Sequence, residues 1–197
     1  MVETVIDKCP RIETERLVLR KCEPGDLEGF IRLNTDRRVY EFFRSNPSIE
    51  DCEIGFQLGM QKQAEDGFGF AVVEHKDTSS FLGFCGLEIP SYAAGRLPCE
   101  PCVEIGYRLL PEAWGKGIIR EASRRWLRFG FETLKLDEVV AYTVVQNHRS
   151  RRVMEKLGMV YDPADDFDFP GVDVDHPLCR HVLYRLSADK FMGQSNG

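Results

Sequence analysis

Apolar and polar positions in the first half of the chain predict one strand, two helices and then three further strands. Residues 15–21 (ERLVLRK) alternate between polar and apolar side chains, as a half-buried strand does. Pro24 is placed to begin a helix over PGDLEGFIRL, and Ser48 and Gly67 are placed to begin and end a second helix. The stretches FGFAVVEHKDTSSFLGFCGLEI and CVEIGYRLL are typical of three strands, the first two joined by a polar turn.

In the second half of the chain, helices alternate with strands. A helix is predicted over GIIREASRRWLRFGFETLK, because its apolar residues recur at spacings of three to five: Ile118, Ala122, Trp126, Phe129 and Leu134. A strand (EVVAYTVV), a short helix (HRSRRVMEKLG) and a final strand (VLYRLS) follow. A run of strands followed by helices that alternate with strands indicates a mixed sheet in an α/β or mixed α+β fold. We expect residues 1–190 to form a single domain and residues 191–197 to be a disordered tail.

The overall composition narrows the class of protein. The chain has 197 residues, 43% of them hydrophobic, which is enough to bury one core. Its formal net charge of −6 argues against a nucleic-acid-binding protein, which would usually be basic. The sequence has no apolar run long enough to span a membrane, and its N-terminus lacks the apolar core of a signal peptide. We therefore expect a cytoplasmic protein that binds neither nucleic acid nor a membrane.

Seven cysteines are scattered along the sequence, and an odd number in a chain of this length favours reduced thiols. Cys99 and Cys102 form a C-x-x-C pair that could ligate zinc together with His176, Cys179 and His181. The sequence lacks a second close pair with the spacing of a zinc site, so we expect no metal. A zinc-stabilised interaction domain is kept as a weaker alternative.

The segment PEAWGKGIIREA places two glycines between a predicted strand and a predicted helix. Unpaired N–H groups at a helix N-terminus attract anions, and glycines let a ligand approach the backbone closely. Lys116 and Arg120 add positive charge at the same point. The segment matches neither G-x-G-x-x-G nor the Walker motif. It is therefore either a cradle for a phosphate or pyrophosphate, or only a flexible connector.

Four stretches of the sequence resemble the GNAT N-acetyltransferases, and most closely the branch that acetylates the N-termini of ribosomal proteins. TERLVLR is similar to the first strand of that branch, EIGYRLLPEAWGKG to its fourth strand and acetyl-CoA loop, NHRSRRVMEKLGM to its Asn-x-x-Ser helix, and HVLYRLS to its closing strand. They occur in the expected order over nearly the whole chain. In the loop motif Q/R-x-x-G-x-G/A, the first position is Trp114 and the last is Ile119.

The resemblance implies a GNAT-like fold, with a central mixed, mostly antiparallel sheet flanked by helices, and acetyl-CoA as co-substrate. It places the backbone of the fourth strand beside the pantetheine arm and the N–H groups of the glycine loop on the pyrophosphate. The residues that it assigns to cofactor binding are Leu109, Leu110, Gly115, Lys116, Gly117, Ile118, Ile119, Arg120 and Asn147. Further candidates to reach the CoA phosphates are Arg149, Arg151 and Arg152.

The same resemblance implies two catalytic residues. Ser150 would donate a proton to the departing CoA thiolate, and Glu104 would accept the proton of the attacking amine. From the residues alone, Asn147 also fits a helix cap, and Glu104 also fits a surface carboxylate on an alternating strand. Weaker candidates, which more often form a core or a cleft wall, are Tyr107, Tyr161, His176 and Tyr184.

Between Asp162 and Asp175 the chain carries six aspartates and no lysine or arginine (DPADDFDFPGVDVD). Such a run is usually a solvated loop, but the two phenylalanines within it favour a lid that attracts a cationic acceptor. We therefore predict an acetyl-CoA-dependent N-acetyltransferase that acts on a protein N-terminus, a polyamine or another cationic small amine. A CoA-binding sensor or regulatory module without catalysis is the alternative. Whether the chain forms a homodimer is left open.

Overall fold

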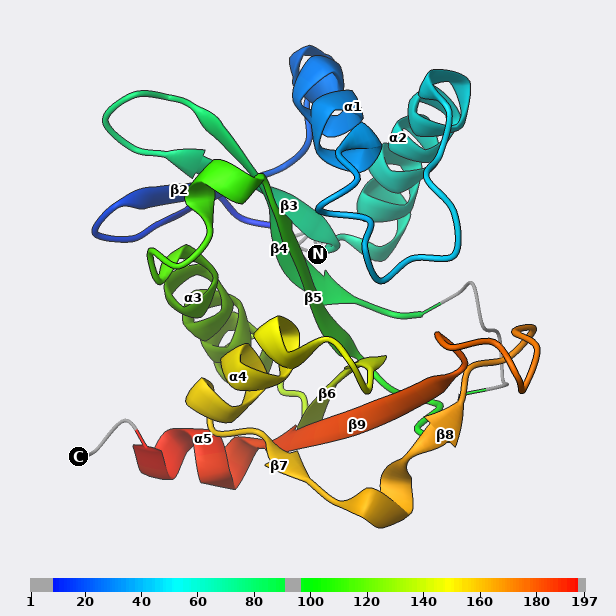
Figure 1. Cartoon of the computed structure of the whole chain (residues 1–197). Helices are drawn as coiled ribbons and strands as arrows, with labels where there is room; N and C mark the ends of the chain where they lie inside the picture. The colour runs from blue at the N-terminus through cyan, green and yellow to red at the C-terminus, as the bar shows by residue number, and fades with distance from the viewer. Residues whose placement is uncertain (1–8, 91–96, 195–197) are drawn as a thin grey trace.

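One mixed sheet forms the centre of the computed structural model, which describes residues 9–90 and 97–194 (Figure 1). The strands follow the order β1-β2-β3-β4-β5-β6-β9-β7, and β8 pairs with β9. Their bounds are β1 Ile12–Glu13, β2 Leu17–Arg20, β3 Phe70–His75, β4 Phe81–Glu88, β5 Glu104–Leu109, β6 Glu138–Val144, β7 Val160–Tyr161, β8 Phe167–Asp168 and β9 Arg180–Ser187. Every pair is antiparallel except β5 with β6, so the expected mostly antiparallel mixed sheet is confirmed.

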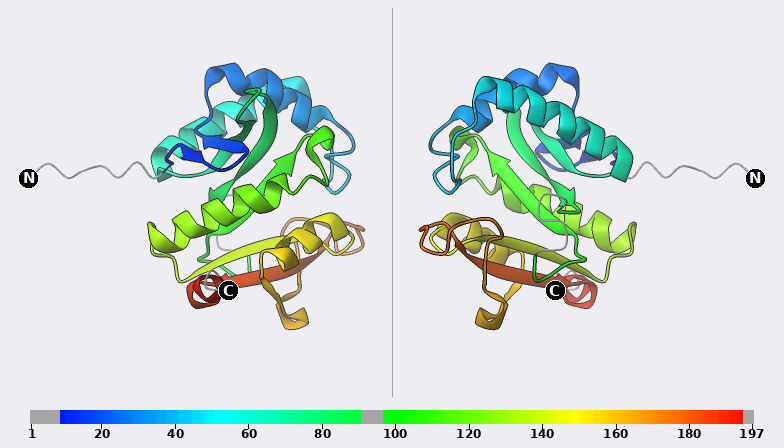
Figure 2. Two further views of the ribbon diagram at one scale, coloured as in Figure 1. Left: turned by 90° about the vertical axis from the view of Figure 1, so that its left-hand side faces the viewer. Right: turned by 90° about the vertical axis from the view of Figure 1, so that its right-hand side faces the viewer.

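Helices cover both faces of this sheet. They are α1 Leu27–Thr35, α2 Ile49–Asp66, α3 Ile118–Glu132, α4 His148–Lys156 and α5 Ala188–Gln194. Figure 2 shows α1 and α2 on one side of β3 and β4, and α3 on the other. Leu33 of α1 and Phe56 of α2 pack with Phe84 of β4 in one core cluster. The larger cluster lies on the α3 side, where Trp126 and Leu127 are fully buried.

The helix boundaries follow from the capping residues. Ser48 accepts a hydrogen bond from the N–H group of Asp51, and Gly67 ends α2 with φ of 74°, as the sequence predicts. The next long helix, α3, has Gly117 as its N-cap residue, and the φ of Gly117, 75°, is left-handed. The apolar stripe predicted for α3 is buried at Ile118 and Trp126, so its amphipathic character is confirmed.

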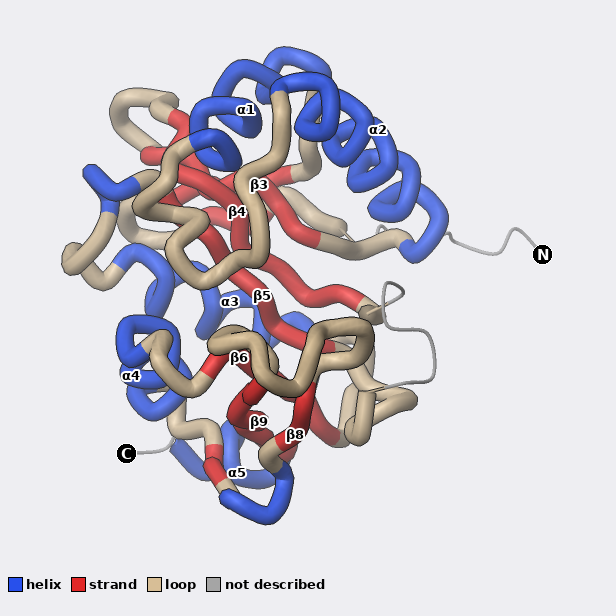
Figure 3. The backbone as a smooth tube through the Cα atoms, turned by 45° about the vertical axis from the view of Figure 1, so that its right-hand side comes forward, coloured by secondary structure: helices blue, strands red, loops and turns tan. Residues whose placement is uncertain are grey.

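The sheet opens between β5 and β6, and this opening divides it into two halves. These strands pair at one position, Glu104 with Val140, although both continue for several residues beyond it. By contrast, β6 and β9 stay paired from Glu138 to Val144. Figure 3 shows β3, β4 and β5 near α1 and α2, and β6, β8 and β9 in the other half of the molecule near α4 and α5. The parallel pair therefore diverges beyond Glu104.

Some elements differ from those expected. The short strands β1, β7 and β8 are each two residues long, too short for a repeating pattern to reveal them. The expectation of a disordered tail from residue 191 is wrong for residues 191–194, because α5 continues to Gln194 and buries Phe191. The remaining tail residues, 195–197, lie outside the described residues. Among the described residues, none of the helices is long and apolar enough to span a membrane.

Candidate active site

The backbone of β5 presents hydrogen-bonding groups to the opening beside β6. Leu110 donates its N–H group to the carbonyl of Leu82 at 2.9 Å. Because backbone groups alternate in direction along a strand, those of Tyr107 and Leu109 face away from β4 and toward the opening. The carbonyl of Leu110 also accepts a hydrogen bond from Ala113. The N–H and carbonyl groups of Leu110 are therefore engaged within the chain, whereas those of Tyr107 and Leu109 face the opening.

The loop after β5 forms an N–H cradle. Gly115 and Gly117 both have left-handed φ angles, of 73° and 75°. Among the described residues, none accepts a hydrogen bond from the backbone N–H groups between Gly115 and Arg120. Arg16 holds the loop in place by donating to the carbonyl of Lys116 at 3.1 Å. These unengaged N–H groups at the N-terminus of α3 are suited to bind an anion.

The two isoleucines that follow do not fill this cradle. Ile118 is buried, and Ile119 is partly buried against the apolar cluster below α3. A β-branched residue replaces the small residue of the usual loop motif, but its side chain packs against the core. The departure from the motif is therefore compatible with the cradle.

Asn147 caps α4, and both of its side-chain polar atoms are engaged. Its Oδ1 accepts a hydrogen bond from the N–H group of Ser150 at 3.2 Å, and its Nδ2 donates to Oγ1 of Thr143 at 3.0 Å. The helix-cap interpretation is therefore confirmed. The hydrogen bond from Ser150 to Asn147 holds Ser150 on the first turn of α4, on the side that faces β5.

Ser150 contacts a tyrosine that the sequence placed only among the weaker candidates. The hydroxyl oxygen of Tyr107 lies 3.0 Å from Oγ of Ser150 and 3.2 Å from its carbonyl oxygen. Burial raises the pKa of Tyr107 above its usual value, so the phenol keeps its proton at neutral pH. The two hydroxyls therefore form a connected pair of possible proton donors between β5 and α4.

Glu104 begins β5 and is only 7% exposed, so the interpretation as a surface carboxylate is wrong. It lies directly opposite Glu88 of β4, on the same face of the sheet. Burial raises the pKa of Glu104 well above its ordinary value, and the charge of Glu88 raises it further. The pKa of Glu88 is also raised, mainly by burial. Two carboxyls with raised pKa values beside an opening in the sheet form a candidate proton acceptor.

Comparison with known proteins identifies the family to which this geometry belongs. Residues 16–160 match the family described as acetyltransferase (GNAT) domain. The chain belongs to the GNAT acetyltransferase family. A Bacillus subtilis protein named "Putative ribosomal N-acetyltransferase YdaF" is 42% identical over 151 residues, which are 74% of this chain and 79% of that protein. The resemblance seen in the sequence is therefore confirmed, and the chain is an acetyl-CoA-dependent acyltransferase.

Solved GNAT structures share the fold. An acetyltransferase of this family from Bacillus anthracis has a TM-score of 0.74 at 23% identity and covers 91% of this chain and 99% of that chain. Spermidine N-acetyltransferase from Vibrio cholerae, solved with CoA and spermine, has a TM-score of 0.70 at 21% identity and covers 91% of this chain and 99% of that chain. These likenesses show that the chain has the fold of solved GNAT acetyltransferases.

On the α1 side of β5, Arg108 contacts a cluster of polar and aromatic side chains. Its Nη1 donates to Oδ1 of Asn34 and, at 2.8 Å, to the hydroxyl of Tyr40. Its guanidinium lies 4.8 Å from the ring centre of Phe43. Within the described part of the chain, Arg108 forms no ion pair with a carboxylate. This side of β5 therefore carries a cation whose remaining donors can contact a ligand.

The segment between α1 and α2 reaches the N-terminus of α4. Arg149 pairs with Glu41, lies 5.9 Å from the ring centre of Phe42 and stacks on Trp114 at 4.6 Å. An open cavity of about 280 Å³ lies at this contact, lined in part by Gln146. Arg149 thus joins the segment 36–48, the cradle loop and α4. The sequence offered it only as a candidate phosphate ligand, because contacts between such distant segments have no local signal.

The aspartate loop is built differently from the expected lid. Asp165 pairs with Arg185 at 2.6 Å, and Asp168 pairs with Arg180 at 3.2 Å. Phe167 is buried against Leu183 and its neighbours. The expectation that the loop attracts a cation through these acids is corrected, since strand β9 already supplies two arginines to them.

The proposed zinc ligands do not assemble. Among the described residues there is no group of three or more His, Cys, Asp or Glu side chains placed to hold a metal ion. Nδ1 of His176 accepts a hydrogen bond from the N–H group of Leu178, and Nδ1 of His181 lies 2.9 Å from the carbonyl of Cys179. The weaker candidates Tyr161 and Tyr184 stack on each other in the other half of the sheet. None of these four is joined to Ser150 or Glu104.

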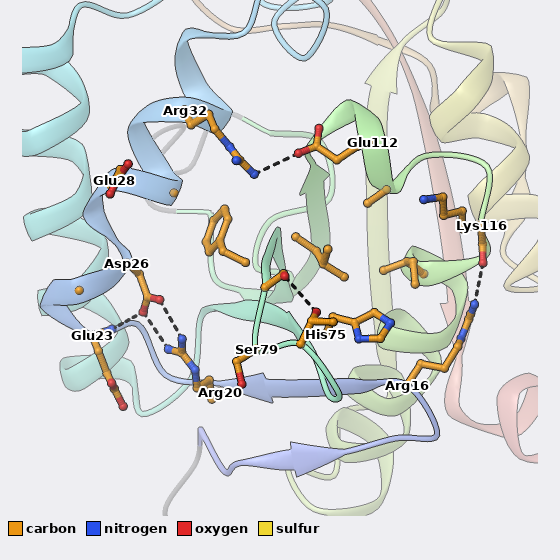
Figure 4. Close-up of a pocket in the computed structure, with 18 residues that line it drawn as sticks. Arg16, Arg20, Glu23, Asp26, Glu28, Arg32, His75, Ser79, Glu112 and Lys116 are labelled. Carbon is orange, nitrogen blue, oxygen red and sulfur yellow. Dashed lines mark hydrogen bonds and ion pairs between the residues drawn. The ribbon is translucent and has the colours of Figure 1, made fainter.

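A cavity of about 930 Å³ is lined by residues of β2, α1, the turn between β3 and β4 and the loop after β5, and by no residue of β5, β6 or α4. Figure 4 shows its wall, with Arg32 and Glu112 paired at 3.0 Å across one side. Lys116 and Ile118 of the cradle loop also line it. The cavity therefore neighbours the cradle, whereas Glu104, Tyr107 and Ser150 do not line it.

Proposed function

We propose that this GNAT enzyme transfers the acetyl group to a primary amine by direct attack of the amine on the thioester, and that the acceptor is a peptide or protein N-terminus. The observation that carries the proposal is the two-sided character of β5. Glu104 and Arg108 lie on the face toward α1, whereas Tyr107 lies on the opposite face and contacts Ser150. Such a strand separates a proton acceptor from a proton donor.

Glu104 accepts the proton of the amine on the α1 side. An amine must be deprotonated to attack, and a carboxylate with a raised pKa is a stronger base than an ordinary one. Glu88, which lies opposite, keeps the local charge negative and favours the approach of a protonated amine. The acidic pair therefore both attracts the acceptor and removes its proton.

Ser150 serves the leaving group on the other side. Its hydroxyl donates a proton to the thiolate of CoA as the carbon–sulfur bond breaks, and Tyr107 donates to Ser150 in turn. The products are an N-acetyl amide and CoA with a free thiol. A protonated amine loses two protons in this reaction: one passes through Glu104 to solvent, and the other replaces the proton that Ser150 and Tyr107 give to the thiolate. The backbone N–H groups between Gly115 and Arg120 are suited to bind the pyrophosphate. The N–H group of Leu109 is suited to donate a hydrogen bond to the pantetheine arm.

Arg108 favours a peptide acceptor over a polyamine. A peptide N-terminus carries a carbonyl oxygen next to its amine, and a guanidinium donates to such an oxygen. A polyamine offers only ammonium groups and methylenes, and a second ammonium near Arg108 is repelled. The 42% identity to a protein whose name specifies ribosomal N-acetylation supports the same choice.

The test compares acceptors for the same enzyme. Release of free CoA thiol is measured with short peptides that have a free N-terminus, with the same peptides blocked at the N-terminus, and with spermidine. We expect thiol release and an acetylated product only with the free peptides, and Arg108→Gln to lower kcat/KM for them by about tenfold, the effect of one lost charged hydrogen bond. A higher kcat/KM for spermidine than for every peptide would overturn the acceptor assignment.

A further inference from the structure

Acetyl transfer leaves the C-x-x-C pair of the sequence without a role. Cys99 and Cys102 are both free thiols, and their sulfur atoms lie 3.0 Å apart. Cys99 packs in a small apolar cluster with Val140, Phe167 and Leu183, and Cys102 lies at the partly exposed edge of that cluster. The pair sits in the segment that leads directly into β5.

A metal does not explain this pair. Within the described residues no third metal-ligating side chain completes a site around the two sulfurs. Two thiols in contact, separated by two residues, are instead suited to form a disulfide with each other.

We propose that Cys99 and Cys102 form a reversible dithiol–disulfide site, and that its oxidation slows acetyl transfer by displacing Glu104. The effect on acetyl transfer rests on the proposed role of Glu104, whereas the formation of the disulfide is independent of that role. The oxidant is a small-molecule disulfide of the glutathione type.

The exchange proceeds in two balanced steps. The Cys99 thiolate attacks one sulfur of the small disulfide, which forms a mixed disulfide and releases one small thiolate. Cys102 then loses its proton to solvent and attacks the sulfur of Cys99, which closes the protein disulfide and releases the second small thiolate. In total two protein thiols are oxidised, one small disulfide is reduced to two thiols, and excess small thiol reverses the reaction.

The environment favours this pair over the other cysteines. The hydrogen bond from Cys102 lowers the pKa of Cys99, which increases the fraction of reactive thiolate. Burial raises the pKa of Cys22 and of Cys85 to about 12, so these thiols stay protonated. Oxidation is therefore expected at Cys99 and Cys102 before Cys22 and Cys85.

The link to catalysis follows from position. To form a disulfide the two sulfurs must approach from 3.0 Å to about 2 Å, so the segment around them must shift. Cys102 precedes Glu104 by two residues, and Glu104 starts the strand that lines the opening. A shift of about 1 Å in a catalytic group can lower the rate by up to about 100-fold.

The experiment equilibrates the full chain in buffers of reduced and oxidised glutathione, followed by alkylation of the remaining thiols, peptide mass spectrometry and kinetics. We expect the loss of two hydrogen atoms in a Cys99–Cys102 disulfide and a fall in kcat of up to about 100-fold, both reversed by a reducing agent. Cys99→Ser and Cys102→Ser should form no such disulfide. Cys22→Ser is the control and should respond to oxidation like the wild type.

Three results would overturn the proposal. A chain that keeps both thiols free in fully oxidised glutathione, or that forms its first disulfide elsewhere, contradicts the site. Stoichiometric zinc in the purified reduced protein, released by oxidation, would show that the pair ligates a metal. An unchanged kcat in the fully oxidised chain contradicts the link to Glu104, whereas the activity of Glu104→Gln in reducing buffer tests the proposed function separately.

Discussion

The phenol oxygen of Tyr107 lies 3.0 Å from the hydroxyl oxygen of Ser150, although the two residues are 43 positions apart in the chain. Tyr107 comes from the strand that lines the opening in the sheet, and Ser150 comes from the first turn of α4, where Asn147 holds its N–H group. The contact therefore joins the two elements on either side of the opening. It puts two protonated hydroxyls where a leaving thiolate needs a donor.

Replacing the hydroxyl of Ser150 should affect the chemical step alone. We expect Ser150→Ala to lower kcat by about 100-fold, because the proton is donated only as the carbon–sulfur bond breaks. The KM for acetyl-CoA should change little. Steady-state kinetics at saturating amine measure both constants.

Tyr107→Phe provides the matched comparison, since it removes only the second hydroxyl of the pair. A smaller fall in kcat than that of Ser150→Ala is expected, because Ser150 remains in place. Wild-type kcat in folded Ser150→Ala would remove this residue from the mechanism.

The cradle can be tested through its left-handed glycines. Val at position 117 cannot adopt the φ of 75° without strain, so Gly117→Val should disturb the loop and weaken CoA binding by more than about 1 kcal/mol. Gly171→Val is the control, because Gly171 has a φ of 76° but lies in the aspartate loop. Calorimetry should show weaker CoA binding for the first variant only, and equal affinity in the two folded variants would count against the cradle.

The acidic pair makes the rate depend on pH in a defined direction. Glu104 accepts a proton only when it is deprotonated, so kcat/KM should rise as pH increases through its raised pKa. Glu88→Gln removes a charge that raises this pKa, and the rising limb should therefore move to lower pH. Glu132→Gln, at the far end of α3, should leave the limb where it is. Superimposable profiles for Glu88→Gln and the wild type would show that the two carboxyls do not interact.

The ion pairs of the aspartate loop lead to a different prediction for its variants than the sequence alone suggests. Because Asp165 and Asp168 pair with arginines of β9, replacing both with Asn should lower stability by no more than about 1 kcal/mol per pair. The KM for the amine should be unchanged at low and high salt. Thermal unfolding and salt-dependent kinetics measure the two effects, and a KM that rises only at low salt would restore the lid hypothesis.

Much of the fold could be predicted from local patterns. The cap at Ser48, the stop at Gly67 and the apolar stripe of α3 depend on neighbouring residues, and each was found where expected. The backbone of the loop before α3 could also be predicted, since two glycines before a helix favour left-handed φ angles, which Gly115 and Gly117 have. The binding of pyrophosphate by this loop stays a prediction. The GNAT resemblance then implied the central mixed, mostly antiparallel sheet flanked by helices.

The chemistry of the site depends on contacts that local patterns do not contain. Alternation along β5 put Glu104 and Tyr107 on opposite faces, but the burial of Glu104 and its position opposite Glu88 required the register of β4 with β5. Likewise, the contact of Arg149 with Trp114 and Glu41 joins three segments far apart in the sequence. In the aspartate loop, the sequence run contains no basic residue, and the arginines that pair with Asp165 and Asp168 lie on β9.

The most direct test of the account is the rate of acetyl transfer by Glu104→Gln, an isosteric change that removes the proposed base. Thiol release is followed in a single turnover, with a peptide acceptor and enzyme already saturated with acetyl-CoA, in reducing buffer. We expect the rate to fall by about 100-fold or more while the affinity for acetyl-CoA is unchanged. Transfer at the wild-type rate by the folded variant would contradict the assignment of Glu104, and with it the two-sided mechanism built on β5.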